Sequence, residues 1–134
     1  MFLNSFTHAL DPKGRMVVPA TFRAELGGVF YLAIGDSGEI DIWPREAFDE
    51  RVAEKKALAK GDPRREFEMR AFASSASEVV MDAQFRLAIP PSLRAKGGLE
   101  PGATVVVNGT LDHAEIWAAD RLAAYEQQFT GTGA

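Results

Sequence analysis

The feature that most constrains this sequence is an internal repeat, since one supersecondary unit must serve twice in the same chain. A block at residues 11–26 returns in altered form at residues 82–97. The two blocks share an acid, a base and a proline in the same order, at Asp11 and Asp82, Arg15 and Arg86, and Pro19 and Pro90. Further along, a hairpin pattern ends in Trp43 and again in Trp117. The matches in order indicate a true duplication.

Each copy has the pattern of two short strands around a turn, a short helix, a hairpin and a closing helix. The stretch Asp11-Pro12-Lys13-Gly14 has the residue preferences of a type I turn, and Pro19 ends the next strand and opens the short helix. In the first copy the expected strands are residues 6–10, 15–19, 29–35 and 39–43, and the expected helices 19–26 and 44–60. In the second copy the expected strands are residues 77–81, 86–90, 103–109 and 114–117, and the expected helices 91–96 and 119–129.

The number of strands decides how the two copies combine. Four short strands are too few for one copy to hide the edges of its own sheet. Two copies in one chain can interleave and cover each other. We therefore expect an α+β fold of two intertwined βαββ-type repeats that form one domain. Residues 1–60 hold the first repeat with its following helix, residues 61–77 a helical connector, and residues 78–134 the second repeat with its C-terminal helix.

Composition excludes several classes of function. The chain has no cysteine and only two histidines, His8 and His113, without the helical spacing of a metal site, so we expect no metal and no cofactor. A serine–histidine–acid set and a glycine-rich phosphate loop are also missing, so we expect neither an enzyme nor a small-molecule substrate. No apolar run approaches the roughly 20 residues that cross a bilayer, and no secretory signal opens the chain. We therefore expect a cytoplasmic protein with no membrane partner.

The distribution of charge is more informative than the net charge of −4. An acidic chain argues against nucleic acid, because DNA-binding proteins usually carry a basic surface. In residues 11–24, however, Lys13, Arg15 and Arg23 are balanced by Asp11 alone. Residues 44–77 mix eight basic with seven acidic side chains, which indicates a solvated helical surface. Positive charge is thus concentrated at the repeated block.

Two interpretations of the repeated Asp–Arg motif are open. The two side chains can pair with each other across the turn, which is a structural role. Alternatively, the aspartate sets the turn and the arginine projects toward a phosphate or a base edge. For Arg23 and Arg94, on the short helices, a solvent-facing side chain is the simpler interpretation. The two tryptophans are expected to pack in the core.

These residues resemble the MraZ family of bacterial regulators, relatives of the AbrB-type swapped-hairpin DNA-binding proteins. The resemblance is carried by the block "DPKGR…VP…FR", the copy "DAQFR…IP" and the hairpin ending "EIW". The family signature is Asp-x-x-x-Arg in each half, and the second half has Phe85 where glycine is usual. The resemblance implies two AbrB-like swapped-hairpin repeats in one β-barrel-like domain with peripheral helices.

The resemblance also implies a function. It implies a sequence-specific DNA-binding transcriptional regulator that forms homo-oligomeric rings and is cytoplasmic and nucleoid-associated. Such a protein would repress its own division and cell-wall gene cluster by binding short direct repeats in promoter double-stranded DNA. The residues expected at the DNA are Lys13, Gly14, Arg15, Arg23 and Arg86. The residues expected to shape the motifs are Asp11, Asp82, Pro19 and Pro90.

Other functions compete with this interpretation. A ring-forming scaffold that binds protein partners without DNA is favoured by the acidic composition and by the altered second motif. An antitoxin-like relative would require a free C-terminal segment, and few residues follow the last expected helix. A ring of DNA-binding turns has one physical advantage: repeated weak contacts gain avidity of about 10²–10⁴.

Overall fold

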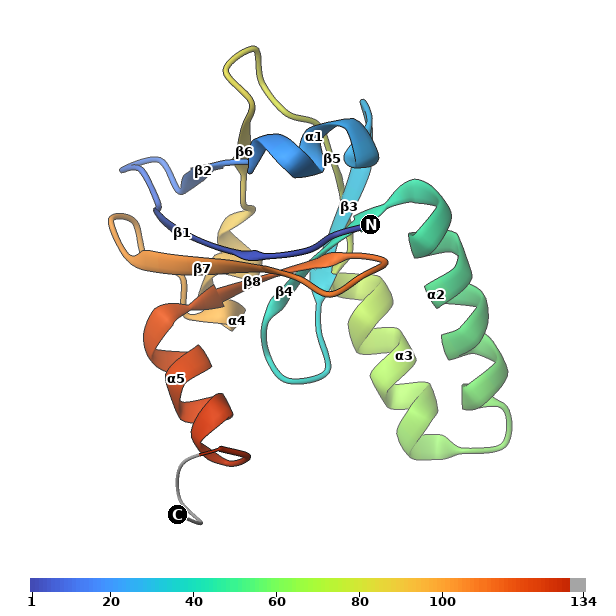
Figure 1. Cartoon of the computed structure of the whole chain (residues 1–134). Helices are drawn as coiled ribbons and strands as arrows, with labels where there is room; N and C mark the ends of the chain where they lie inside the picture. The colour runs from blue at the N-terminus through green and yellow to red at the C-terminus, as the bar shows by residue number, and fades with distance from the viewer. Residues whose placement is uncertain (131–134) are drawn as a thin grey trace.

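The structure is a computed structural model that describes residues 1–130, and it has eight strands and five helices (Figure 1). The strands are β1 (Ser5–Ala9), β2 (Arg15–Val17), β3 (Phe30–Ile34), β4 (Ile40–Pro44), β5 (Ser77–Val79), β6 (Arg86–Ala88), β7 (Thr104–Gly109) and β8 (Ala114–Ala118). The helices are α1 (Ala20–Leu26), α2 (Arg45–Ala59), α3 (Pro63–Ser75), α4 (Pro91–Gly97) and α5 (Ala119–Gln127). The order predicted for both copies is confirmed, with α3 between them. Residues 131–134 of the second repeat lie outside the described residues.

The two repeats share their sheets. A six-stranded sheet has the order β1-β7-β8-β4-β3-β5, and β2 pairs with β6 in a separate two-stranded sheet. The first strand of each repeat lies beside the third strand of the other, because β1 pairs with β7 and β5 pairs with β3. The last strands, β4 and β8, pair in the middle of the six-stranded sheet. Neither repeat therefore supplies a complete sheet by itself.

The expectation of a barrel-like domain is wrong, because the sheet is open. A barrel closes only when its two edge strands pair. Here the edge strands β1 and β5 each have one neighbour. The strands that could join them, β2 and β6, have three residues each and pair only with one another. They lie over one face of the larger sheet instead (Figure 1).

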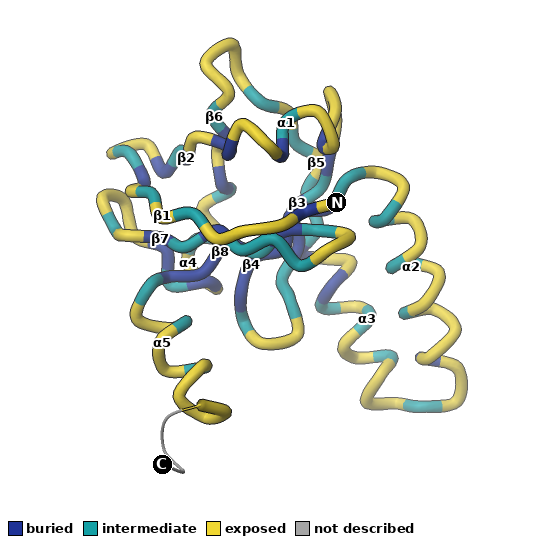
Figure 2. Tube along the Cα trace, in the orientation of Figure 1, coloured by how far each residue is buried: buried dark blue, intermediate teal, exposed yellow. Residues whose placement is uncertain are grey.

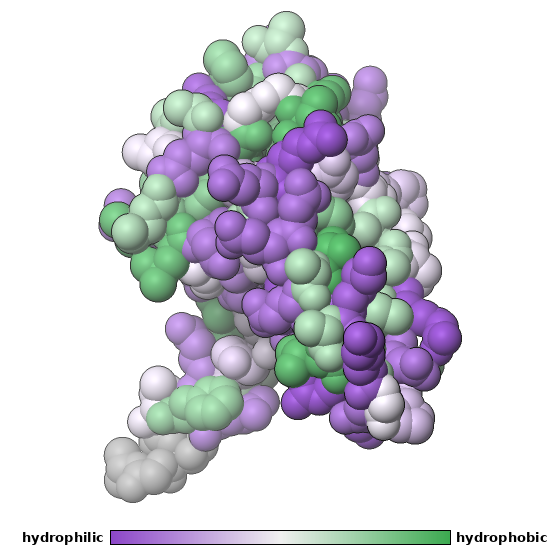
Figure 3. All heavy atoms as spheres, turned by 90° about the vertical axis from the view of Figure 1, so that its right-hand side faces the viewer, coloured by the Kyte–Doolittle hydropathy of each residue, from purple (hydrophilic) through white to green (hydrophobic). Residues whose placement is uncertain are grey.

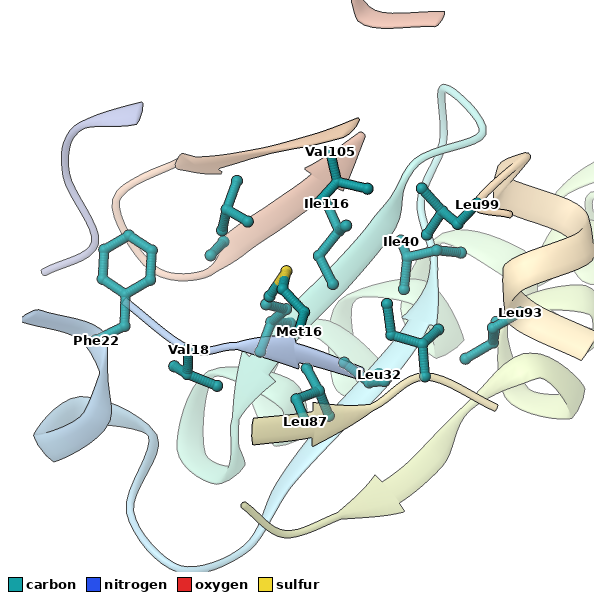
Figure 4. Packing of buried hydrophobic residues seen from close by; sticks show 14 of the residues in the cluster. Met16, Val18, Phe22, Leu32, Ile40, Leu87, Leu93, Leu99, Val105 and Ile116 are labelled. Carbon is teal, nitrogen blue, oxygen red and sulfur yellow. The ribbon is translucent and has the colours of Figure 1, made fainter. Parts of the chain in front are cut away.

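The core lies between the two sheets. In β2 and β6 the middle residues face inward, and Met16 lies opposite Leu87 in the ladder at 1% and 0% exposure. These two residues are equivalent positions of the repeat, so an approximate two-fold axis passes between them. Around them pack buried side chains of both repeats (Figure 4), among them Val18, Phe22, Leu32, Ile40, Leu93, Leu99, Val105 and Ile116. Figure 2 shows the same concentration of burial along the central strands.

Proline opens both short helices. Pro19 and Pro90 are the N-terminal caps of α1 and α4, with φ angles of −51° and −53°, close to the angle that the ring fixes. Their carbonyls accept hydrogen bonds from the backbone of Phe22 at 2.9 Å and Arg94 at 3.0 Å. The structural role of both prolines in the repeated motif stays a prediction.

Helices α2 and α3 form a pair beside β3. Phe48 of α2 stacks on Tyr31 at 4.3 Å between ring centroids and on Phe72 of α3 at 5.7 Å. Their outer surface is mostly hydrophilic with small hydrophobic areas between (Figure 3). The mixed charges there form ion pairs such as Arg70 with Glu66, as the mixed-charge sequence predicts. Within residues 1–130 none of the helices is long and apolar enough to cross a bilayer.

The shared core yields a test of how the two repeats depend on each other. We expect Leu87→Ala to lower the free energy of unfolding by about 2–5 kcal/mol, because it leaves a cavity under the β2–β6 ribbon. Leu58→Ala, at a side chain that is 48% exposed, should change it by less than about 0.5 kcal/mol. Urea unfolding at one protein concentration measures both. Equal effects of the two substitutions would contradict this assignment of the core.

Candidate nucleic-acid interface

The turn at residues 11–15 is built around one carboxylate. Oδ1 of Asp11 accepts hydrogen bonds from the backbone N–H groups of Lys13 and Arg15, both at 2.9 Å. Oδ2 accepts a third hydrogen bond from Nε of Arg15 at 2.6 Å. Gly14 closes the turn with a φ of +75° and donates its N–H to the Asp11 carbonyl at 2.9 Å. Lys13 at the tip is exposed.

The second turn has the same geometry, although Phe85 replaces the glycine. Oδ1 of Asp82 accepts from the backbone N–H groups of Gln84 and Arg86 at 2.9 Å each, and Oδ2 accepts from Nε of Arg86 at 2.8 Å. Phe85 has a φ of +60°, a conformation that residues other than glycine rarely adopt. The Asp82 carboxylate thus holds the turn without a glycine.

The arginine of each turn makes the contact with aspartate that a structural role requires, and it also stays partly exposed. In both turns the arginine pairs with the aspartate four residues before it. The hydrogen bond uses Nε, and the terminal Nη1 and Nη2 groups lie outside it. The side chains of Arg15 and Arg86 are 27% and 29% exposed. The pair therefore fixes the direction of a guanidinium that still reaches the surface.

The β2–β6 ribbon brings the two arginines together. Arg15 lies opposite Ala88, and Val17 lies opposite Arg86. Side chains alternate between the faces of a strand, so these four residues share the face that points away from Met16 and Leu87. Val17 and Ala88 on that face are exposed. We call the surface of Arg15, Val17, Arg86 and Ala88 the outer ribbon face.

Each turn is held by a helix arginine of the other repeat. Nε of Arg94, in α4, donates to the Ile89 carbonyl at 3.0 Å, and a side-chain carbon added at Gly14 would meet the Arg94 guanidinium at 2.6 Å. At the equivalent position of the first repeat, Nε of Arg23 donates to the Val18 carbonyl at 3.0 Å. Its guanidinium lies 4.2 Å from the centre of the Phe85 ring.

These contacts correct the simpler interpretation of the helix arginines. Arg23 and Arg94 are partly buried and hold turns, whereas a solvent-facing arginine would have no such contacts. Gly14 is buried, and its N–H and carbonyl are both used, the carbonyl accepting from Ile89 N–H at 3.2 Å. Sequence reasoning missed this cross-repeat contact, although the repeat places Arg23 and Arg94 at equivalent positions. The signal was the shared spacing from each turn arginine to each helix arginine.

Hydrogen bonding within each turn perturbs its aspartate. The backbone N–H of Arg15 lowers the pKa of Asp11 below its ordinary 3.8, and the Arg15 side chain and Lys13 N–H act in the same direction. The backbone N–H of Arg86 lowers the pKa of Asp82 in the same way. Both carboxyls are therefore ionised at neutral pH, in the form that accepts all three hydrogen bonds.

A second group of polar residues was not singled out by sequence reasoning. Asp41, His113 and Glu115 place one ligand atom each within 4.8 Å of one another, on the outer side of β4 and β8. The available signal was alternation: acidic or imidazole side chains occupy every second position beside the buried isoleucines Ile40 and Ile116. Of the described residues these three form the one group able to hold a metal ion.

Comparison with known proteins identifies the class and then the family. The chain is similar to curated proteins named transcriptional regulator: 35% identity to that of Corynebacterium diphtheriae, over 96% of this chain and 88% of the relative. It is 37% identical to that of Thermomicrobium roseum, over 99% and 92%, and 41% identical to that of Desulforapulum autotrophicum, over 90% and 82%. All three relatives carry the name MraZ. The sequence model of the MraZ protein family, described as antitoxin-like, matches residues 1–68 and 72–132. The chain belongs to the MraZ family.

The contact between Gly14 and Arg94 can be tested with a matched glycine. Gly14→Ala and Gly38→Ala both force alanine into a positive φ, +75° and +89°, which costs about 1–2 kcal/mol. No atom lies within 4 Å of the carbon added at Gly38, whereas the carbon at Gly14 displaces Arg94. Urea unfolding should therefore show the larger loss for Gly14→Ala. In an Arg94→Ala background the two losses should become equal, and a difference that persists would contradict the contact.

The turns also predict a pH dependence. A lowered pKa in the folded state adds stability above the ordinary value of 3.8, and this is lost as the pH falls through the lowered pKa. We expect the carboxyl resonances of Asp11 and Asp82 in an NMR titration to titrate below the ordinary aspartate pKa of 3.8. Arg15→Ala should leave the pKa of Asp11 below 3.8, because the backbone donor remains. A return to the ordinary value would assign the shift to the guanidinium instead.

Proposed function

We propose that this protein is a sequence-specific DNA-binding transcriptional regulator that contacts DNA through the outer ribbon face and the Lys13 turn. The observation that carries this proposal is the placement of Arg15 and Arg86 on one exposed face of a two-stranded antiparallel ribbon. The major groove of DNA admits such a ribbon, and arginine is the commonest reader of guanine. The names of the relatives support the same function.

The Asp–Arg pairs support DNA recognition because they hold each arginine side chain in one orientation before DNA binds. A guanine edge offers two acceptors, which two N–H groups of one guanidinium can contact. With Nε held by Asp11, Arg15 loses little side-chain entropy on binding, and such ordering costs about 0.5–1.5 kcal/mol per mobile side chain. The exposed Val17 and Ala88 between the arginines suit the methyl group of thymine. Asp11 and Asp82 then have a positioning role.

The two turns differ in what they offer to a phosphate. Lys13 at the first tip carries an ammonium, and its counterpart in the second turn is Gln84. We therefore assign the stronger contact to the first turn and a weaker one to Arg86. Gly14 and Arg23 contribute through the shape of the turns, because Gly14 is covered by Arg94 and Arg23 covers Phe85. A direct contact of either with DNA stays a prediction.

We further propose that the repeats are AbrB-type swapped hairpins and that the chain assembles into a homo-oligomeric ring. The exchange of β1 and β5 between repeats supports the first proposal. Open sheet edges at β1 and β5 and exposed apolar side chains such as Leu3, Val80 and Leu111 support the second. A ring offsets the weakness of one turn on a chain of net charge −4.

The ring also fits the expected target. Subunits related by rotation present their turns in one sense, which suits short direct repeats, whereas a two-fold dimer prefers a palindrome. We propose that the protein is cytoplasmic and nucleoid-associated and represses its own division and cell-wall gene cluster from such promoter repeats. A second candidate function is a ring-forming scaffold for protein partners without DNA. It is favoured by the net charge of −4 and by the altered second turn, which has Gln84 and Phe85 where the first has Lys13 and Gly14.

The test is binding of a labelled fragment of the protein's own promoter, measured by fluorescence anisotropy at several salt concentrations. We expect Arg15→Ala to weaken binding by about 10- to 100-fold, the equivalent of one arginine–guanine contact of about 1–3 kcal/mol. Lys13→Ala should lower the slope of log affinity against log salt by about 1. Arg70→Ala, at an exposed arginine of α3 outside the interface, is the matched control and should bind as wild type does.

Two outcomes separate the candidates. A wild-type protein that forms no salt-sensitive complex with the promoter fragment, yet sediments as a closed oligomer, is the scaffold. A protein that sediments as a monomer at micromolar concentration contradicts the ring under either function. Loss of binding in Arg70→Ala equal to that in Arg15→Ala would indicate a general electrostatic effect and contradict the assigned interface.

A further inference from the structure

Three ligand-type side chains converge where the two repeats meet in the six-stranded sheet. Asp41 of β4 lies directly opposite Glu115 of β8 in the antiparallel ladder. His113 is two residues before Glu115 and therefore points to the same face of the strand. Nε2 of His113 lies 3.9 Å from Oδ1 of Asp41 and 3.8 Å from Oε2 of Glu115. The three atoms border a polar hollow of about 470 Å³ between this face and α2.

Two of the three side chains, His113 and Glu115, are oriented by a hydrogen-bond partner on the atom that would not bind a metal. Nδ1 of His113 lies 2.7 Å from Oδ1 of Asp112, so a proton on Nδ1 leaves the lone pair of Nε2 directed at the hollow. The ring is also stacked on Trp43, with centroids 3.9 Å apart. Oε1 of Glu115 accepts from Nε1 of Trp117 at 2.9 Å, which leaves Oε2 facing His113. An acid that holds the far nitrogen of a histidine is a recurrent second layer of metal sites.

The third ligand atom, Oδ1 of Asp41, is buried and has no hydrogen-bond partner. Asp41 is 6% exposed, and its Oδ1 has no hydrogen-bond donor in the structure. A buried carboxylate without a donor is costly, and two acids directly opposite each other on neighbouring strands repel. Among the described residues that line the hollow, Arg51 is the one with a permanent positive charge, and its guanidinium pairs with Asp36 and Glu54 rather than with the three ligand atoms.

We propose that Asp41, His113 and Glu115 bind one divalent transition-metal ion of the zinc type. One imidazole nitrogen and two carboxylate oxygens suit zinc, which binds such atoms at about 2.0–2.2 Å. Tetrahedral geometry with these bonds separates neighbouring ligands by about 3.4 Å. The separations of 3.9 and 3.8 Å from His113 exceed this by about 0.5 and 0.4 Å, and all three ligand atoms lie within 4.8 Å of one another, so side-chain rotations would have to bring them closer on binding. A fourth ligand, such as water, would come from the side of the polar hollow.

The bound ion would join the two repeats. Asp41 comes from the first repeat, and the other two ligands come from the second, so the metal would bridge the β4–β8 pair at its centre. Binding to the folded state alone stabilises that state in proportion to the logarithm of metal concentration. Metal occupancy would thus stabilise the seam between the repeats, away from the outer ribbon face. This inference does not depend on the proposed DNA binding.

The test uses the untagged full chain, freed of metal by a chelator and dialysed. We expect titration with Zn²⁺ against a fluorescent chelator to show one equivalent bound per chain, with no competition from Mg²⁺ or Ca²⁺ at equal concentration. Co²⁺ should give the visible absorption of a four-coordinate site. Zn²⁺ should raise the midpoint of thermal unfolding. A wild-type chain that binds no stoichiometric Zn²⁺ overturns the proposal.

Variants assign the ligands. His113→Asn should abolish binding, and Asp112→Asn, at an exposed residue, should weaken it about 10- to 100-fold through the orientation of the imidazole. Asp41→Asn removes a buried unpaired carboxylate, so the metal-free variant should unfold no more easily than wild type while losing its response to Zn²⁺. His8→Asn, at the other histidine of the chain, and Asp120→Asn are the controls and should bind as wild type does. Binding by His113→Asn equal to wild type would overturn the site.

Discussion

The pairing of β2 with β6 is the constraint on which the rest of the structure depends. This short ribbon places Met16 opposite Leu87 at the centre of the core and, on its other face, brings Arg15 and Arg86 to the surface. A three-residue strand has too few hydrogen bonds to be stable alone. It is stable here because helix arginines of opposite repeats fasten its two turns and because both inward residues are fully covered.

The Asp–Arg motif joins local structure to the proposed function. The same carboxylate that accepts the backbone N–H groups of the turn also directs the arginine. Solvent screening limits what such an ion pair adds to stability, so its effect on the orientation of the guanidinium is the more significant one. The proposed zinc site is arranged in the same way. Asp112 orients His113 and Trp117 orients Glu115, the two side chains that would bind the metal together with Asp41.

Much of the fold could be predicted from the sequence because its signals are local. Proline at Pro19 and Pro90, the Asp11 turn and the alternation of apolar residues each act within a few residues. The barrel prediction was wrong because closure depends on whether two distant edge strands meet, which no local pattern specifies. The helix arginine contacts and the Asp41–His113–Glu115 group were missed for a related reason. Each joins residues of different repeats, far apart in the chain, and becomes visible only when the two copies are placed against each other.

At one of the positions where the two turns differ, the first has Gly14 and the second has Phe85. Two identical turns related by a two-fold axis would look the same from either end of a linear ligand. Gly14 lets a guanidinium sit directly on the backbone, whereas Phe85 inserts an aromatic ring beneath the equivalent guanidinium. This exchange removes the equivalence while keeping both backbones alike. The two ends of the ribbon therefore differ, so that a linear polymer with a direction of its own would be bound in one orientation.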